Sequence, residues 1–138
     1  MTIRENIMLP GRYDDSKPES YYHQRAQELM ERFGLAHRAE SYPNRISGGE
    51  QQRTAISRAL IMDPEVILAD EPTGNLDTKS GDVVLEILDN LNKKDKKTIV
   101  VVTHEQEVAR RAFRSVTIRD GVMTIGKSKG YAKKKATH

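Results

Sequence analysis

Hydrophobic residues recur at helical spacing in three stretches of the chain, over residues 22–33, 47–62 and 83–91. Gly34 follows the first stretch as a plausible C-cap, and Asp63-Pro64 ends the second, as expected at helix termini. The sequence therefore predicts three amphipathic helices. The apolar positions that define their faces are Tyr22, Ala26, Leu29, Met30 and Phe33; Ala55, Ile56, Ala59 and Leu60; and Val83, Val84, Ile87, Leu88 and Leu91.

Two short apolar runs, at residues 66–69 and 98–103, are typical of strands buried in a parallel sheet. A short helix is predicted at 108–112, and Asp120-Gly121 indicates the turn of a β-hairpin. The polar stretch 10–20 is rich in turn formers and predicts a loop. The order of elements predicts an α/β fold with parallel strands, an N-terminal helical subdomain and a C-terminal β-hairpin.

The composition narrows the class of protein. At 138 residues the chain is one domain or part of one. It has no cysteine, which excludes a disulfide framework. No apolar run approaches the ~20 residues of a membrane-spanning helix, and the first residues, MTIREN, lack the apolar core of a signal peptide. These features predict a soluble, intracellular chain.

The net charge of +3 is concentrated at the C-terminus, where residues 127–138 carry five lysines and no acid. Subtracting these five charges from +3 leaves −2 on the rest of the chain. We expect 127–138 to be a solvated, disordered tail, with contact to acidic lipid headgroups or nucleic acid as the less favoured interpretation.

The segment Ile46–Arg53 begins the second predicted helix with the letters ISGGEQQR. Ser47 and Glu50 have the spacing of a capping box, which closes a helix N-terminus. Capping alone does not require Gly48 and Gly49, whereas glycines allow a ligand to approach backbone N–H groups that favour anions. Plain capping and phosphate binding are both open on these residues alone.

Two further features lie at strand ends. Asp70 and Glu71 follow the run 66–69, where acids suit a Mg²⁺ partner and a residue that deprotonates water, although such pairs also occur in ordinary turns. His104 ends the other run, in the segment Thr103-His104-Glu105, where a lone histidine is more often structural. Because parallel strands emerge at the same edge, His104 could lie near Glu71. The remaining histidines, at positions 23, 37 and 138, have no such setting and receive no role.

Taken together, Ser47-Gly48-Gly49-Glu50, Asp70-Glu71, residues 74–77 (GNLD) and His104 resemble, in content and order, the ATP-binding subunit of ABC transporters. The likeness runs from about Thr2 to Ile125. The stretch 71–77 (EPTGNLD) is more specifically similar to the branch that serves lipoprotein release, macrolide or peptide export and cell-division permeases.

The resemblance implies a role for each matched residue. Two subunits of this family sandwich two ATP molecules, so the signature residues Ser47, Gly48, Gly49 and Glu50 would act on ATP held by the opposite subunit. In the family pattern Asp70 would hold Mg²⁺ through water, Glu71 would be the general base, and His104 would contact the γ-phosphate. Asp77 would communicate across the dimer interface. Glu50 departs from the commonest family form, which has glutamine there.

The family's phosphate-binding Walker A loop would precede everything in this chain, since Thr2–Ile7 resembles the segment just after the glutamine-bearing loop. Residues 121–128 (GVMTIGKS) do satisfy the pattern G-x-x-x-x-G-K-[ST]. That pattern needs a compact turn that opens into a helix, whereas residues 122–125 are apolar and β-prone. We therefore interpret 121–128 as a hairpin and expect the chain to be N-terminally truncated, without Walker A.

The resemblance divides the chain into a partial ATPase domain at 1–126 and the tail at 127–138. Within the domain, about 1–62 would be the helical signature subdomain and about 63–126 the core part with Walker B and the switch histidine. The chain would belong to an ATPase that uses ATP and Mg²⁺, pairs with a second ATPase subunit and sits on the inner face of the cell membrane through a permease. By itself it is expected not to hydrolyse ATP.

Two alternatives stay open. The chain could be a non-enzymatic module that pairs with full-length subunits, or a nucleic-acid-associated ABC ATPase whose lysines contact phosphates. The second is disfavoured by the stretch 71–77 and by the lack of long coiled-coil heptads.

Overall fold

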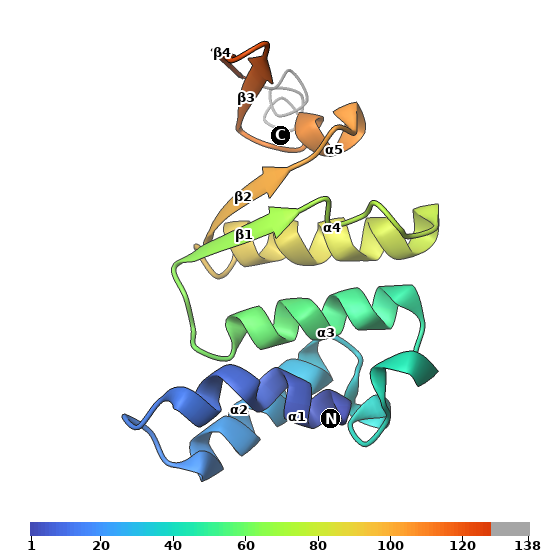
Figure 1. Ribbon diagram of the computed structural model, residues 1–138, viewed down its shortest axis with the longest axis vertical. Coiled ribbons are helices and arrows are strands. Elements are labelled where there is room, and N and C mark those ends of the chain that lie inside the picture. The colour runs from blue at the N-terminus through green and yellow to red at the C-terminus, as the bar shows by residue number, and fades with distance from the viewer. Residues whose placement is uncertain (128–138) are drawn as a thin grey trace, which may run out of the picture.

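A computed structural model describes residues 1–127 of the chain. The regular elements of the N-terminal part are all helices, which stack on one another at one end of the molecule (Figure 1). Short 3₁₀ segments connect them. The elements are α1 (Ile3–Met8), η1 (Leu9–Tyr13), α2 (Glu19–Arg32), η2 (Ala36–Arg38), η3 (Pro43–Arg45) and α3 (Gly48–Leu60).

The second half alternates strands and helices before it ends in a hairpin. Strands β1 and β2 pair in parallel, with Val66 opposite Thr98 and Asp70 opposite Val102. Strands β3 and β4 pair in an antiparallel hairpin. This confirms the predicted α/β fold, its parallel strands and its C-terminal hairpin. The elements are β1 (Val66–Asp70), α4 (Thr78–Lys93), β2 (Thr98–Val102), α5 (Gln106–Arg110), β3 (Arg114–Arg119) and β4 (Val122–Lys127).

The N-terminal segment differs from the prediction. The loop expected at 10–20 is partly wrong, because η1 covers Leu9–Tyr13 and α2 already begins at Glu19. Helix α1 is absent from the elements that the sequence predicts. Its signal was present, since Thr2 and Glu5 form a capping box in which Glu5 N–H donates to Thr2 Oγ1 at 3.3 Å and Thr2 N–H to Glu5 Oε2 at 2.7 Å.

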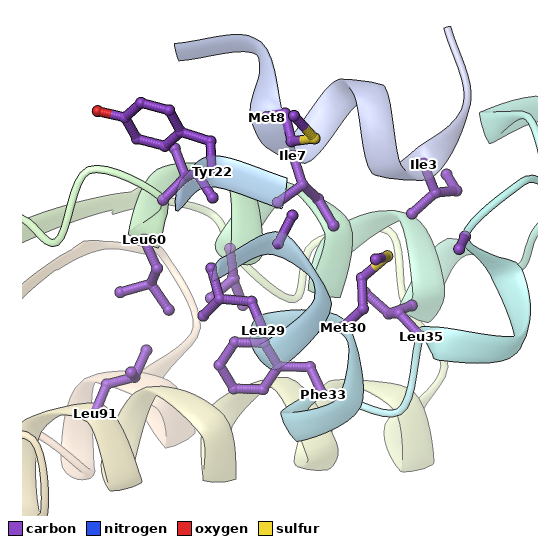
Figure 2. Close-up of a cluster of buried hydrophobic side chains, with 14 of the residues drawn as sticks. Ile3, Ile7, Met8, Tyr22, Leu29, Met30, Phe33, Leu35, Leu60 and Leu91 are labelled. Atoms are coloured by element: carbon purple, nitrogen blue, oxygen red, sulfur yellow. The ribbon is translucent and has the colours of Figure 1, made fainter. Parts of the chain in front are cut away.

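One hydrophobic cluster joins the helices to the sheet. Its centre is fully buried, as in Ile3, Ile7, Met30 and Leu35, and α4 contributes Leu91 from the other half of the chain (Figure 2). Burial of such side chains contributes about 1.5–3 kcal/mol each. The cluster therefore fixes α3 against α4, which places the N-terminus of α3 beside the loop that follows β1 (Figure 1).

Among the residues that the structure describes, β1 and β2 are covered on one face only, so the prediction that both strands are buried is wrong for their other face. Ile67 is 5% exposed and points into the cluster, whereas its neighbour Leu68 is 78% exposed. Val100 and Val102 share the open face with Leu68. Helix α4 packs on a single face of this two-stranded sheet, which accounts for the exposure of the other face.

The hairpin at the other end begins its turn at Asp120-Gly121, where both residues have positive φ, 51° and 78°. Lys127 is the last residue of β4 and not the first of a tail, and the remainder of the predicted tail lies outside the described residues. Within the part that the structure describes, no helix is both long and apolar enough to cross a bilayer.

Candidate functional site

The N-terminus of α3 has the geometry that the capping-box spacing predicts. Ser47 is extended at the N-cap position, and its Oγ accepts the N–H of Glu50 at 3.2 Å. The Glu50 carboxylate reaches back, and its Oε2 accepts the N–H of Ser47 at 2.8 Å. Ser47 and Gly48 remain on the surface, so a ligand can reach this helix end.

The two glycines have a packing reason that the sequence did not reveal. A Cβ on Gly48 would lie 3.3 Å from Leu76 Cδ2, and one on Gly49 would lie 3.2 Å from Ser80 Cβ and Oγ. Leu76 precedes α4 and Ser80 lies in its first turn. The glycines thus bring α3 close to the loop after β1, and this packing is compatible with ligand binding at the same helix end.

Glu50 is the buried centre of a charged cluster around this terminus. Its Oε1 accepts from Arg38 Nε at 3.1 Å and lies 3.5 Å from His37 Nε2. The backbone hydrogen bond from Ser47 and the Arg38 guanidinium lower the pKa of Glu50 to about 2. Neither Arg38 nor His37 has a predicted role, because both precede α3 in a separate element, η2.

The lowered pKa of Glu50 makes a pH-dependent prediction. A carboxyl whose pKa falls on folding contributes stability above its unfolded pKa, near 4.5, and loses it as the pH falls towards about 2. We expect wild type to unfold at a higher temperature than Glu50→Gln at pH 6, and the gap to shrink between pH 4.5 and 2. Thermal unfolding followed by circular dichroism measures this gap. Glu86→Gln, an acid-to-amide change on the exposed side of α4, is the control, and a gap of constant size for Glu50→Gln would contradict the assignment.

Glu71 and His104 meet at the carboxyl ends of β1 and β2. Their proximity, expected from parallel strands, is confirmed, since His104 Nδ1 lies 2.6 Å from Glu71 Oε1. The backbone N–H of His104 also donates to Glu71 Oε1 at 3.0 Å. Because an ionised carboxylate only accepts, the imidazole must donate from Nδ1, which leaves Nε2 directed elsewhere.

The pair shifts the titration of both partners. The hydrogen bond from the His104 side chain is the main cause that lowers the pKa of Glu71, and the same bond raises the pKa of His104. The His104 side chain is 84% exposed, so solvent screens this interaction. The geometry therefore gives a carboxylate held ionised beside an imidazole that readily takes up a proton.

Three residues without an assigned role connect the two strand ends. Thr103 Oγ1 donates to Glu71 Oε2 at 3.3 Å and accepts the N–H of Glu105 at 3.0 Å. Thr73 Oγ1 donates to Glu105 Oε1 at 3.0 Å. Glu71 itself has φ of 45°, a left-handed conformation that is uncommon outside glycine and often found at functional sites. Only the position of Thr103 beside His104 signalled this network in the sequence.

Asp70 is the last residue of β1, and its side chain is exposed at the same edge. Among residues 1–127, no group of three or more histidine or acidic side chains converges on a point. This donor set does not fit a cation held by protein alone, but it fits Mg²⁺, which keeps several waters and uses one or two carboxylates with substrate phosphates. Asp70 is thus able to hold such an ion through water.

Asp77 caps α4 instead of standing free in the loop. Its Oδ2 accepts the N–H of Ser80 at 3.2 Å, and the Ser80 side-chain hydrogen bond leads the causes that lower the Asp77 pKa. Asp77 therefore stiffens the segment that packs against Gly48 and Gly49. Its expected role between subunits stays a prediction.

The segment that satisfies the P-loop pattern is a β-hairpin over its described residues. Gly121 occupies the turn, and residues 122–127 form β4, paired with β3 along their length. Up to residue 127, the last one that the structure describes, the chain after Gly121 is a strand and not a helix, so the backbone N–H groups of β4 pair with β3 and do not form a concave phosphate cradle. The match is coincidental.

The comparisons with known proteins agree with one another. The family model described as "ABC transporter" matches residues 1–74. The lipoprotein-releasing system ATP-binding protein LolD 1 of Rhodopseudomonas palustris is 45% identical over 120 residues, which cover 87% of this chain and 53% of the relative. The macrolide export ATP-binding/permease protein MacB of the same species is 51% identical over 118 residues, which cover 86% of this chain and 18% of the relative.

A solved structure, the dimeric ATP-binding cassette MJ0796 bound to ADP and Pi, superposes with a TM-score of 0.78 at 41% identity. The match covers 94% of this chain and 58% of that chain. The chain therefore spans about half the length of LolD 1 and of this cassette. The names LolD and MacB agree with the branch that residues 71–77 predict.

Proposed function

This chain belongs to the ABC transporter family of ATP-binding subunits, and from that premise we propose that it supplies one part of a composite ATPase site. The proposed groups are the signature at Ser47–Glu50, the Walker B acids Asp70 and Glu71, and the switch histidine His104. The phosphate-binding loop of the site would lie on a stretch of polypeptide outside these 138 residues.

One observation carries the proposal. Glu71 and His104 are in contact at the edge of a parallel sheet, which is where α/β folds bind ligands. A packed loop from Glu71 to Asp77 links this edge to the helix end at Gly48 and Gly49. An ordinary turn or a lone structural histidine would not require this combination.

In the proposed mechanism Glu71 is the general base. Its carboxylate is held by His104 and Thr103 and keeps lone pairs that can accept a proton from an attacking water. His104 donates from Nδ1 to Glu71, and its exposed Nε2 would contact the terminal phosphate. A bound Mg²⁺ supplies charge neutralisation of the phosphates, and Asp70 would hold it through water.

The signature residues would act on a second nucleotide. Ser47 presents its hydroxyl, and Gly48 its backbone, at the exposed N-terminus of α3, where the helix dipole favours an anion. We propose that this anion is the γ-phosphate of ATP on a second ATPase subunit, with Asp77 near the contact between the two. The dimeric arrangement of MJ0796 supports this view.

The proposed function also assigns a role to each part of the chain, a partner and a location. Residues 1–62 would form the signature subdomain and 63–126 the part of the core with Walker B and His104. A membrane permease would be the partner that the ATPase drives, which would place the chain on the cytoplasmic face of the membrane. The names of LolD 1 and MacB, a releasing system and an export permease, support this proposal.

The test uses the 138-residue chain and a completed cassette. The completed cassette is a fusion of two parts. The N-terminal part of MJ0796, which lies outside the matched region, is placed before this chain. This part is chosen because the family carries its phosphate-binding loop in that region. We expect the chain alone to release no phosphate from Mg-ATP above buffer, because positioning of the phosphates is most of the catalysis. The completed cassette is expected to turn ATP over. Hydrolysis by the pure chain would overturn the proposal.

A further inference from the structure

The charge of Glu50 creates a problem at the helix end where the proposed function puts a phosphate. Its carboxylate caps Ser47 from inside the same helix terminus, with Oε2 2.8 Å from the Ser47 nitrogen. A free carboxylate there would repel an incoming anion and compete with it for the N–H groups. A glutamine, the commoner family residue, would bring no charge.

Arg38 lies where it offsets that charge. Its Nε donates to Glu50 Oε1 at 3.1 Å, the oxygen that does not cap Ser47. The two carboxylate oxygens of Glu50 thus accept from different groups. Oε2 accepts from the Ser47 backbone, and Oε1 accepts from the Arg38 guanidinium. Glu50 is only 9% exposed but the Arg38 side chain is 41% exposed, so water screens this pair in part and less than a pair that is exposed on both sides.

The backbone holds Arg38 in place on both sides. Leu35 before it and Ala39 after it are buried in the hydrophobic cluster, at 0% and 7% exposure. The carbonyl of Ala39 accepts the N–H of Arg4, the second residue of α1, at 3.0 Å. The Arg38 guanidinium therefore extends from a segment whose backbone is fixed by packing and hydrogen bonding. His37 is the other residue whose side-chain nitrogen faces Glu50.

We propose that Arg38 is a positioning residue for the signature, acting through Glu50. This inference rests on the proposed function of Ser47–Glu50. Arg38 turns the Glu50 carboxylate towards Ser47 N–H, compensates its charge, and so leaves the exposed face of the helix terminus able to accept a phosphate. A chain with glutamine at position 50 has no such need of Arg38.

The first test measures Glu50 directly in the 138-residue chain. The carboxyl carbon of Glu50 is followed by NMR from about pH 6 to about pH 1.5, a range that includes the wild-type pKa of about 2, in wild type, Arg38→Ala and Arg38→Lys. We expect the pKa of Glu50 to rise by about 1 or more in Arg38→Ala, because an opposite charge in contact is lost. Arg38→Lys is expected to restore part of the difference. An unchanged Glu50 pKa in Arg38→Ala overturns the proposal.

The second test measures ATP turnover in the completed cassette. We expect Arg38→Ala to lower kcat/KM roughly five- to tenfold, which is less than the roughly tenfold or greater effect of a buried charge-assisted hydrogen bond because the Arg38 side chain is 41% exposed. In a Glu50→Gln background the same change is expected to cost less than about twofold, since coupled residues are not additive. Arg119→Ala, an exposed arginine on the hairpin, is the matched control. Equal costs of Arg38→Ala in both backgrounds would show a merely structural role and overturn the proposal.

Ser47→Ala in the completed cassette separates the two ideas. If Ser47→Ala lowers turnover while Arg38 shows no coupling to Glu50, the signature assignment stands and the role of Arg38 is wrong. If Ser47→Ala leaves turnover unchanged, the proposed function of the signature fails, and with it the inference about Arg38.

Discussion

Replacement of Glu71 by glutamine is expected to lower ATP turnover of the completed cassette by roughly 10²–10⁴-fold, the usual contribution of a general base. Glutamine keeps the shape of the side chain and can still accept from Thr103 and His104. It has lost the carboxylate that would take the proton from water. Steady-state phosphate release measures the effect, and ATP affinity is expected to remain within a few-fold of wild type.

The control for this prediction is Glu65→Gln, the same chemical change just before β1, where the side chain is exposed. It is expected to leave turnover at the wild-type level. Were Glu71→Gln to bind ATP and hydrolyse it at more than about a tenth of the wild-type rate, another group would have to be the base. His104, in contact with Glu71, would then be the first candidate.

The sequence was most informative where local pattern and tertiary structure agree. The predicted strands 66–69 and 98–102 are separated by a helix, and strands connected in this way normally pair in parallel. The contact between Glu71 and His104 at their ends could therefore be predicted from the sequence. The Ser47 capping box was likewise local. In each case short-range rules were enough to fix the geometry.

The rest depended on contacts between distant segments. Arg38 reaches Glu50 from a different element, and nothing in its neighbourhood signals that partner. The packing of Gly48 on Leu76 is a second case, because the double glycine suggested a ligand before it suggested a neighbouring loop. The open face of β1 and β2 is a third, since apolar runs do not reveal how many faces will be covered.

The contrast between the buried hydrophobic cluster and the open sheet face leads to the second large prediction. It compares the same leucine-to-alanine substitution at a buried and at an exposed position. Leu35 is fully buried in the hydrophobic cluster (Figure 2), whereas Leu68 is 78% exposed on the open sheet face. We expect Leu35→Ala to lower the free energy of unfolding by about 2–5 kcal/mol, because it removes buried methyl groups and leaves a cavity. Leu68→Ala is expected to change it by less than about 0.5 kcal/mol.

Urea unfolding of the 138-residue chain, followed by far-UV circular dichroism, measures both effects. Domains of this size are stable by about 5–15 kcal/mol, so Leu35→Ala can unfold the chain completely. Ile7→Val is the milder core substitution, with an expected loss of about 0.5–1.5 kcal/mol, and it keeps the comparison measurable. The variants Leu35→Ala and Leu68→Ala also report on association between chains, because exposed apolar strands tend to pair with other chains. Leu68→Ala should reduce concentration-dependent aggregation, whereas a large loss of stability in Leu68→Ala would mean that this face of the sheet is covered in solution.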